Sequence, residues 1–163
     1  MRGVATDRLT FTQHRRWVFV VLSATFVAVP LLVEPLARRR LGGGGTFDLG
    51  PLQLKLAFNS GVAFSFGDRL PAWVILAVTA TITLVVGAYT WCAAATSSPA
   101  FVVALSLVFA GAGANVIDRA ADGKVTDYFH TGWWPTFNLA DVYIIVGLVL
   151  LLGALWRDST PEP

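Results

Sequence analysis

Charge is scarce in this chain of 163 residues, of which 13% are charged and 55% are hydrophobic. A soluble globular domain carries about 25% charged residues, so this composition indicates segments that face lipid rather than water. The net charge of +2 is small, and no basic run with interleaved aromatic residues is present. Nucleic acid is therefore not expected as a partner, and the length suits one compact domain.

Cysteine and histidine are also rare, and their scarcity excludes several kinds of site. Cys92 is the only cysteine, so an internal disulfide cannot form, and His14 and His130 lie far apart in sequence. The chain has no HExxH motif, no Cys/His cluster at metal-ligand spacing and no GxSxG motif. We therefore expect neither a zinc peptidase nor a serine or cysteine nucleophile, and no metal or cofactor is predicted.

Long apolar segments are what the sequence does contain. Residues 17–36 form an apolar run long enough to span about 30 Å of hydrocarbon. Residues 70–117 carry no charge and are too many for one helix. The short loop AAATSSP divides that stretch into two predicted helices, and a fourth apolar segment follows near the end. The predicted fold is an all-α membrane protein whose second, third and fourth helices cover residues 72–92, 100–117 and 138–156.

The ends of this four-helix domain, residues 17–156, determine its expected topology. We predict a cytoplasmic tail over residues 1–16 and a second tail over residues 157–163. The arginines of the first tail place both termini in the cytoplasm by the positive-inside rule. The three arginines at positions 38–40 would then lie outside, against that rule. The first segment has the basic front of a signal peptide, but its length and the lack of an A-x-A site favour an uncleaved helix.

Polar and flexible residues separate the first two helices. Four consecutive glycines at positions 42–45 predict a hinge. Apolar and polar residues alternate from Leu52 to Phe58, which is typical of a β-strand with one apolar face. Asn59 and Gly61 then predict a turn.

An acidic and a basic residue stand near the outer end of the first helix. Glu34 and Arg38 are four positions apart, so they could pair on one helix face. Such a pair could belong to a site or could only anchor the helix at the membrane boundary. Pro35 lies between them and is expected to loosen or end the helix.

Carboxylates are concentrated in residues 111–141, which hold four of the ten acidic residues. A carboxylate buried at a membrane boundary is costly unless it is paired or neutralised, so these positions predict chemistry. Asn115, Asp118 and Arg119 share one face of the third helix by their spacing. The alternative is that Asp118 and Arg119 form a structural pair that closes the helix.

Two further aspartates flank the connection to the fourth helix. Asn138 and Asp141 have the spacing of a capping box, so Asp141 could serve only as a cap. Asp127 lies in the preceding segment, which we expect to be a short loop that brings Asp127 and Asp141 together. Two adjacent carboxylates share a proton, so one can activate water while the other protonates a carbonyl oxygen. Spacing alone allows a proton relay as readily as a peptidase.

Four motifs in this order resemble those of the lipoprotein signal peptidase family, signal peptidase II. The motifs are NSGVAFSFG (59–67), GANVIDR (113–119), VTDYF (125–129) and FNLAD (137–141). The resemblance implies a four-helix membrane aspartyl endopeptidase with a small extracytoplasmic β-cradle over residues 42–70, between helices 1 and 2. Its substrates would be prolipoproteins with a diacylglyceryl-modified cysteine, cut just before that cysteine at the extracytoplasmic face.

The resemblance also implies roles for single residues. It makes Asp127 and Asp141 the catalytic pair, and membrane lipid and the prolipoprotein the partners. Residues that would support the pair or bind substrate are Asn59, Gly61, Asn115, Asp118, Arg119, Asn138, Glu34 and Arg38. Val62, Phe64, Phe66, Trp133 and Trp134 could receive a lipidated segment, while the two tryptophans could equally form a plain interfacial belt.

The sequence departs from the family pattern at three positions. Glu34 and Arg38 stand where the family usually has Asp and Lys, and Ala114 stands where Gly is usual. Two alternatives to an active peptidase therefore stay open, a small proton-relay or transporter protein and an inactive relative that binds precursors.

Overall fold

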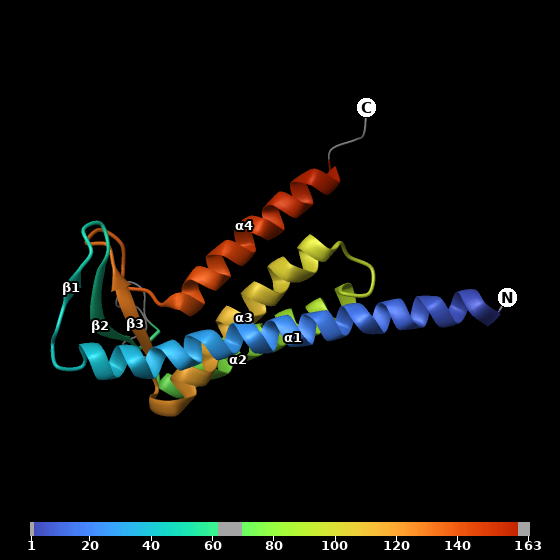
Figure 1. The fold of residues 1–163 in the computed structure, drawn as a ribbon. Helices are drawn as coiled ribbons and strands as arrows, with labels where there is room; N and C mark the ends of the chain where they lie inside the picture. The colour runs from blue at the N-terminus through green and yellow to red at the C-terminus, as the bar shows by residue number, and fades with distance from the viewer. Residues whose placement is uncertain (1, 62–69, 160–163) are drawn as a thin grey trace.

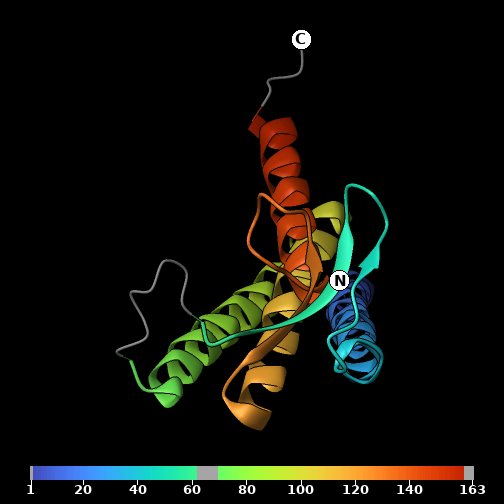
Figure 2. The same cartoon turned by 90° about the vertical axis from the view of Figure 1, so that its left-hand side faces the viewer.

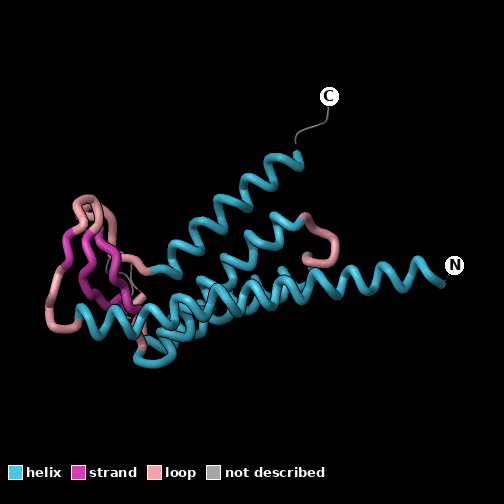
Figure 3. The backbone as a smooth tube through the Cα atoms, in the orientation of Figure 1, coloured by secondary structure: helices cyan, strands magenta, loops and turns pink. Residues whose placement is uncertain are grey.

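The computed structural model describes residues 2–61 and 70–159, and shows four helices and one small sheet (Figure 1). The sheet lies at one end of the helices, and both termini lie at the other end (Figures 1 and 3). In chain order the elements are α1 (Arg2–Leu41), β1 (Phe47–Asp48), β2 (Gln53–Asn59), α2 (Ala72–Ala93), α3 (Pro99–Asp122), β3 (Val125–His130) and α4 (Leu139–Ser159).

Four segments are long and apolar enough to cross a membrane, as the composition predicts. Within the described residues they are Gln13–Leu41, Ala72–Ala93, Pro99–Asp122 and Leu139–Arg157. Even the shortest, with 19 residues, measures close to 30 Å as a helix. The prediction of a four-helix membrane protein is therefore confirmed.

Helix α1 is longer than its apolar core. It begins at Arg2, so residues expected as a polar tail continue the helix, and it ends at Leu41. Pro30 and Pro35 both lie inside it, so of the expectation that Pro35 loosens or ends the helix, the ending is wrong. Proline is tolerated in membrane helices because neighbouring groups satisfy the backbone carbonyl that it leaves free.

Helix α3 lies at the centre and packs against α1, α2 and α4. Its start follows ordinary capping rules, since Ser98 accepts a hydrogen bond from the Phe101 amide and Pro99 occupies the first turn. Gly123, with φ of +82°, closes its end. The helix therefore runs one turn beyond the expected end, and Asp118 and Arg119 lie inside it.

Two glycines allow α3 and α4 to pack closely. A Cβ atom on Gly147 would lie 2.7 Å from the Ala104 carbonyl oxygen and 2.9 Å from the Val108 amide nitrogen. A Cβ atom on Gly111 would overlap the Ala140 carbonyl oxygen. Small residues at such crossings let helix backbones approach each other in membranes. The contact at Gly111 lies one residue from Asp141, so this packing also positions α4 for the site.

The strands form an antiparallel sheet in the order β1-β2-β3. Strand β2 confirms the prediction made from the alternating pattern. Strand β3 was expected as a loop, and this is a correction: Asp127 lies on a strand, opposite Ala57 of β2. Figure 2, in which the sheet faces the viewer, shows the strands lying across the ends of the helices.

We predict that Gly147→Ala lowers the free energy of unfolding by about 1–3 kcal/mol, because the new methyl group meets backbone atoms that cannot move aside. Thermal or denaturant unfolding of the purified protein in detergent would measure the change. Gly153→Ala is the matched control, since a Cβ atom there has no neighbour within 4 Å. Equal stability of the two variants would contradict the close contact between α3 and α4.

Candidate active site

The structure brings the carboxylates of Asp127 of β3 and Asp141 of α4 to the same residue, Asn138. The Asn138 side-chain amide donates a hydrogen bond to Oδ1 of Asp127 at 3.1 Å. The Asn138 backbone amide donates to Oδ2 of Asp141 at 3.0 Å. The two aspartates that the sequence singled out therefore face each other across one residue at the sheet end of the helices.

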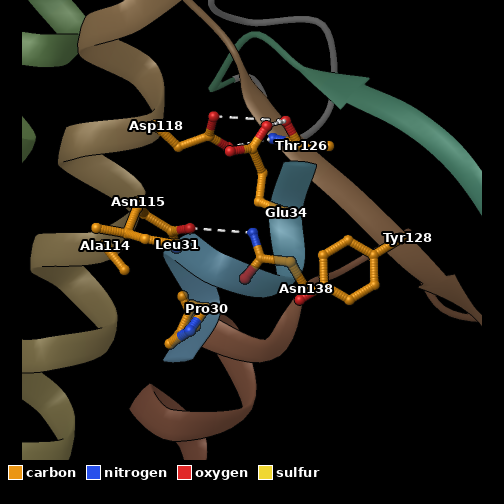
Figure 4. A pocket seen from close by; sticks show the side chains of 10 residues that line it. Pro30, Leu31, Glu34, Ala114, Asn115, Asp118, Thr126, Tyr128 and Asn138 are labelled. Atoms are coloured by element: carbon orange, nitrogen blue, oxygen red, sulfur yellow. Dashed lines mark hydrogen bonds between the residues drawn. The ribbon is translucent and has the colours of Figure 1, made fainter. Parts of the chain in front are cut away.

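Asp141 is also part of a capping box at the start of α4. Its backbone amide donates to Oδ1 of Asn138 at 3.0 Å, in return for the bond that Asp141 accepts. Asn115 of α3 donates to Oδ1 of Asp141 at 2.8 Å and accepts from Asn138 at 3.0 Å, the second of which is drawn in Figure 4. The same contacts that let Asp141 cap the helix therefore also hold it in the candidate site. Both of its carboxylate oxygens accept hydrogen bonds from N–H donors.

Asp127 is held differently, because one of its oxygens is left without a partner. The residue is 1% exposed, and its Oδ2 atom makes no hydrogen bond within the described part of the chain. Burial raises the pKa of Asp127 from 3.8 to about 7, and repulsion from Asp141 adds to this rise. The hydrogen bond from Asn138 and the nearby Asn59 side chain oppose this rise. A carboxyl group with this pKa can hold a proton near neutral pH and release it to a substrate.

Arg119 lies buried beside the pair, without an ion-pair partner among the described residues. Its charge acts on both Asp127 and Asp141. A Cβ atom on Gly61 would lie 3.3 Å from Nη2 of Arg119, and Gly61 has φ of +95°. The Gly61 amide donates to Oδ1 of Asn59 at 2.8 Å, which forms the predicted turn. The turn after β2 thus approaches the guanidinium group closely, where any larger residue would be strained.

A second polar cluster fixes the start of β3. Arg38 pairs with Glu34 as predicted, and it also donates to Asp118 at 3.1 Å and to Asp122 at 2.7 Å. Asp118 in turn accepts from the Thr126 backbone amide at 2.6 Å, and Figure 4 shows Glu34, Asp118 and Thr126 together. Asp118 therefore pairs with Arg38 rather than with Arg119. Because Thr126 directly precedes Asp127, this cluster holds the strand segment that carries Asp127.

A groove opens from Asp141 along the side of α4. Its volume is about 700 Å³, and apart from Asp141 and Asn59 it is mostly apolar. Trp133 and Trp134 line it, with side chains 81% and 57% exposed. Val62, Phe64 and Phe66, which were expected to join this surface, lie outside the described residues. The groove can take an apolar chain segment and lead it to the two carboxylates.

Sequence reasoning missed two residues of this region, Thr126 and Tyr128. The Tyr128 hydroxyl accepts from the Leu139 amide at 3.1 Å, and its burial raises its pKa to about 12. Both residues flank Asp127 in the VTDYF motif, but only the strand geometry of β3 gives them a role. Among the described residues, no three His, Cys, Asp or Glu side chains converge as metal ligands would.

A family profile and the sequences of individual proteins both match most of this chain. The profile described as signal peptidase (SPase) II matches residues 38–157. A "Lipoprotein signal peptidase" of Rhodococcus jostii (strain RHA1) is 32% identical over 149 residues, covering 86% of this chain and 73% of that protein. One of Azoarcus sp. (strain BH72) is 32% identical over 168 residues, covering 98% and 93%.

A solved structure shares the fold. It is a bacterial membrane enzyme determined by the in meso method at 2.3 Å resolution, with a TM-score of 0.75. Sequence identity is 24%, and the match covers 90% of this chain and 92% of that one. At this identity the likeness concerns the arrangement of helices and strands.

We predict that Arg38→Met lowers the free energy of unfolding by about 2 kcal/mol, because the buried carboxylate of Asp118 loses its cationic partner. Unfolding of the purified protein in detergent would measure this. Arg157→Met, which removes an exposed arginine at the other end of the molecule, is the control and should change stability by less than about 0.5 kcal/mol. A loss of equal size in both variants would show that Arg38 has no special structural role.

Proposed function

The chain belongs to the signal peptidase II family, and we propose that Asp127 and Asp141 are the catalytic pair of this aspartic endopeptidase of lipoprotein precursors. The observation that carries the proposal is the position of Asn138, which hydrogen-bonds to both carboxylates at once. The raised pKa of Asp127 supports the proposal, because an aspartic peptidase needs one protonated and one ionised carboxyl group in the same site.

In the proposed mechanism the two aspartates have different tasks. Asp127 holds the shared proton, while Asp141, oriented by Asn115 and Asn138, accepts a proton from the attacking water. The new hydroxyl group bonds to the scissile carbonyl carbon as Asp127 passes its proton to the carbonyl oxygen. The tetrahedral intermediate then collapses, the C–N bond breaks, and Asp141 returns its proton to the leaving amine. A hydroxyl proton goes back to Asp127, which restores the starting state.

The substrate lies in the groove that ends at Asp141. A signal peptide is an apolar segment, and the groove is apolar and runs along a membrane-spanning helix. The scissile bond, just before the diacylglyceryl-modified cysteine, lies at the polar end, where Asn59 and Arg119 can bind the substrate backbone. Asn59 lines this end of the groove, and Arg119 has no ion-pair partner in the described chain.

The sheet end faces the outside of the cell membrane, and both termini face the cytoplasm. Both termini lie away from the sheet, and the first sixteen residues carry four arginines, which favour the cytoplasmic side (Figure 1). The catalytic pair then stands at the extracytoplasmic boundary, where a precursor emerges after translocation.

We expect Asp127→Asn and Asp141→Asn each to lower cleavage of a diacylglyceryl-modified precursor peptide by at least about 10²–10⁴-fold, since each removes one partner in proton transfer. Purified protein and a lipidated peptide would provide the assay. Asp48→Asn, at an exposed position on β1, is the control and should cleave normally. Cleavage retained by either site variant would refute the assignment of the pair.

The raised pKa of Asp127 predicts how cleavage and stability depend on pH. Cleavage should decline as pH rises through about 7, because Asp127 then loses the proton that it donates. Between its ordinary value of 3.8 and about 7, the folded chain keeps a proton that the unfolded chain releases. Stability therefore falls as pH rises across this window, by as much as about 4 kcal/mol for this group.

Asp127→Asn should remove this part of the pH dependence, since an amide cannot ionise. The variant should be more stable than the parent chain at pH 8 and similar to it at pH 4, as measured by thermal unfolding at both values. The same loss of stability with pH in both proteins would show that Asp127 does not carry the proton.

A further inference from the structure

The end of α1 beside the sheet carries positive charge that the active site does not use. Arg39 and Arg40 are exposed in its last turn, and Lys55 lies nearby on β2. All three ion pairs among the described residues involve Arg38, so these other cations have no acidic partner there. Arg38 is accounted for by the cluster around Asp118. In the orientation proposed above, Arg39 and Arg40 lie at the extracytoplasmic face against the positive-inside rule, where an anionic partner would offset their charge.

An apolar groove adjoins these arginines. It has a volume of about 450 Å³ and lies between the end of α1 and the sheet. Leu36 and Ala37 line it from α1, Phe47 and Phe129 line it from the sheet, and Arg40 is the only charged residue among its described lining. It shares no lining residue with the groove that ends at Asp141. This is therefore a second concave surface with its own chemistry, an apolar trough with a guanidinium group at its edge.

We propose that this groove binds an anionic phospholipid, with an acyl chain in the trough and the phosphate on Arg40 and Arg39. The groove is formed by the end of a membrane-spanning helix, and its Leu36 and Phe47 are 57% and 55% exposed, so it lies where acyl chains meet headgroups. Guanidinium groups bind phosphate through paired hydrogen bonds, and each basic residue near an anionic membrane surface strengthens binding by about five-fold. A neutral diacylglyceryl group would leave both arginines unpaired.

Binding there would join α1 to the sheet. Phe47 and Phe129 come from β1 and β3, and β3 also carries Asp127. A lipid that fills the space between them would hold β3 at Phe129, after Asp127 in the chain. The Arg38 cluster holds the same strand at Thr126, before Asp127. The proposal does not depend on the catalytic assignment, because lipid binding needs neither aspartate.

The test measures the association of spin-labelled phosphatidylglycerol and spin-labelled phosphatidylcholine with the full-length protein in phosphatidylcholine vesicles. We expect the parent chain to select phosphatidylglycerol, and Arg40→Gln to reduce this selectivity about five-fold. Arg157→Gln, which removes an exposed arginine at the other end, is the matched control and should keep it. Ala37→Trp, which fills the trough, should reduce association of the anionic lipid although both arginines remain.

Two further measurements distinguish a lipid headgroup from free phosphate, and lipid binding from catalysis. Inorganic phosphate should not displace the spin-labelled lipid, because it offers no acyl chain. Asp127→Asn should bind the lipid as the parent does, whether or not it cleaves precursor. Equal association of the two lipids, unchanged selectivity in Arg40→Gln, or displacement of the lipid by a lipidated precursor peptide would each overturn the proposal. If Arg40→Gln does not fold, the selectivity of Ala37→Trp and Arg39→Gln decides.

Discussion

The structure depends most on one residue, Asn138, which lies between two carboxylates that would otherwise repel each other. Its side chain contacts Asp127 and its backbone contacts Asp141, while Asn115 completes the set from α3. Burying Asp127 beside a second carboxylate costs several kcal/mol unless the pair is hydrogen-bonded or shares a proton. The structure offsets this cost with N–H donors to Asp141 and a raised pKa at Asp127.

The rest of the fold holds α3, α4 and β3 in place around Asn138. Gly111 and Gly147 let α4 approach α3, which places the start of α4 against Asn115. The cluster of Arg38 and Asp118 holds the first residues of β3 by a backbone hydrogen bond at Thr126. The packing of α3 against α4 positions Asp141, and the polar cluster positions the strand segment that carries Asp127.

The membrane explains why the polar groups gather at one end of the molecule. The helices offer apolar surface to lipid along most of their length. Ionised groups there would cost several kcal/mol, so they are placed near the boundary between membrane and water. The sheet covers that boundary and supplies Asp127 together with part of both grooves. One groove is lined by Asp141 and the other by Arg40, so each combines an apolar surface with one charged side chain among its described lining residues.

The sequence by itself determined the four membrane helices, strand β2, the capping box of Asn138 and Asp141, and the pairing of Glu34 with Arg38, because hydrophobic period and local spacing encode them. It also indicated the two aspartates through the order of four motifs. Only the tertiary structure decided that Pro35 stays within a helix, that Asp127 lies on a strand and that Asp118 pairs with Arg38. These features arise from contacts between segments far apart in the chain, about which local spacing carries no information.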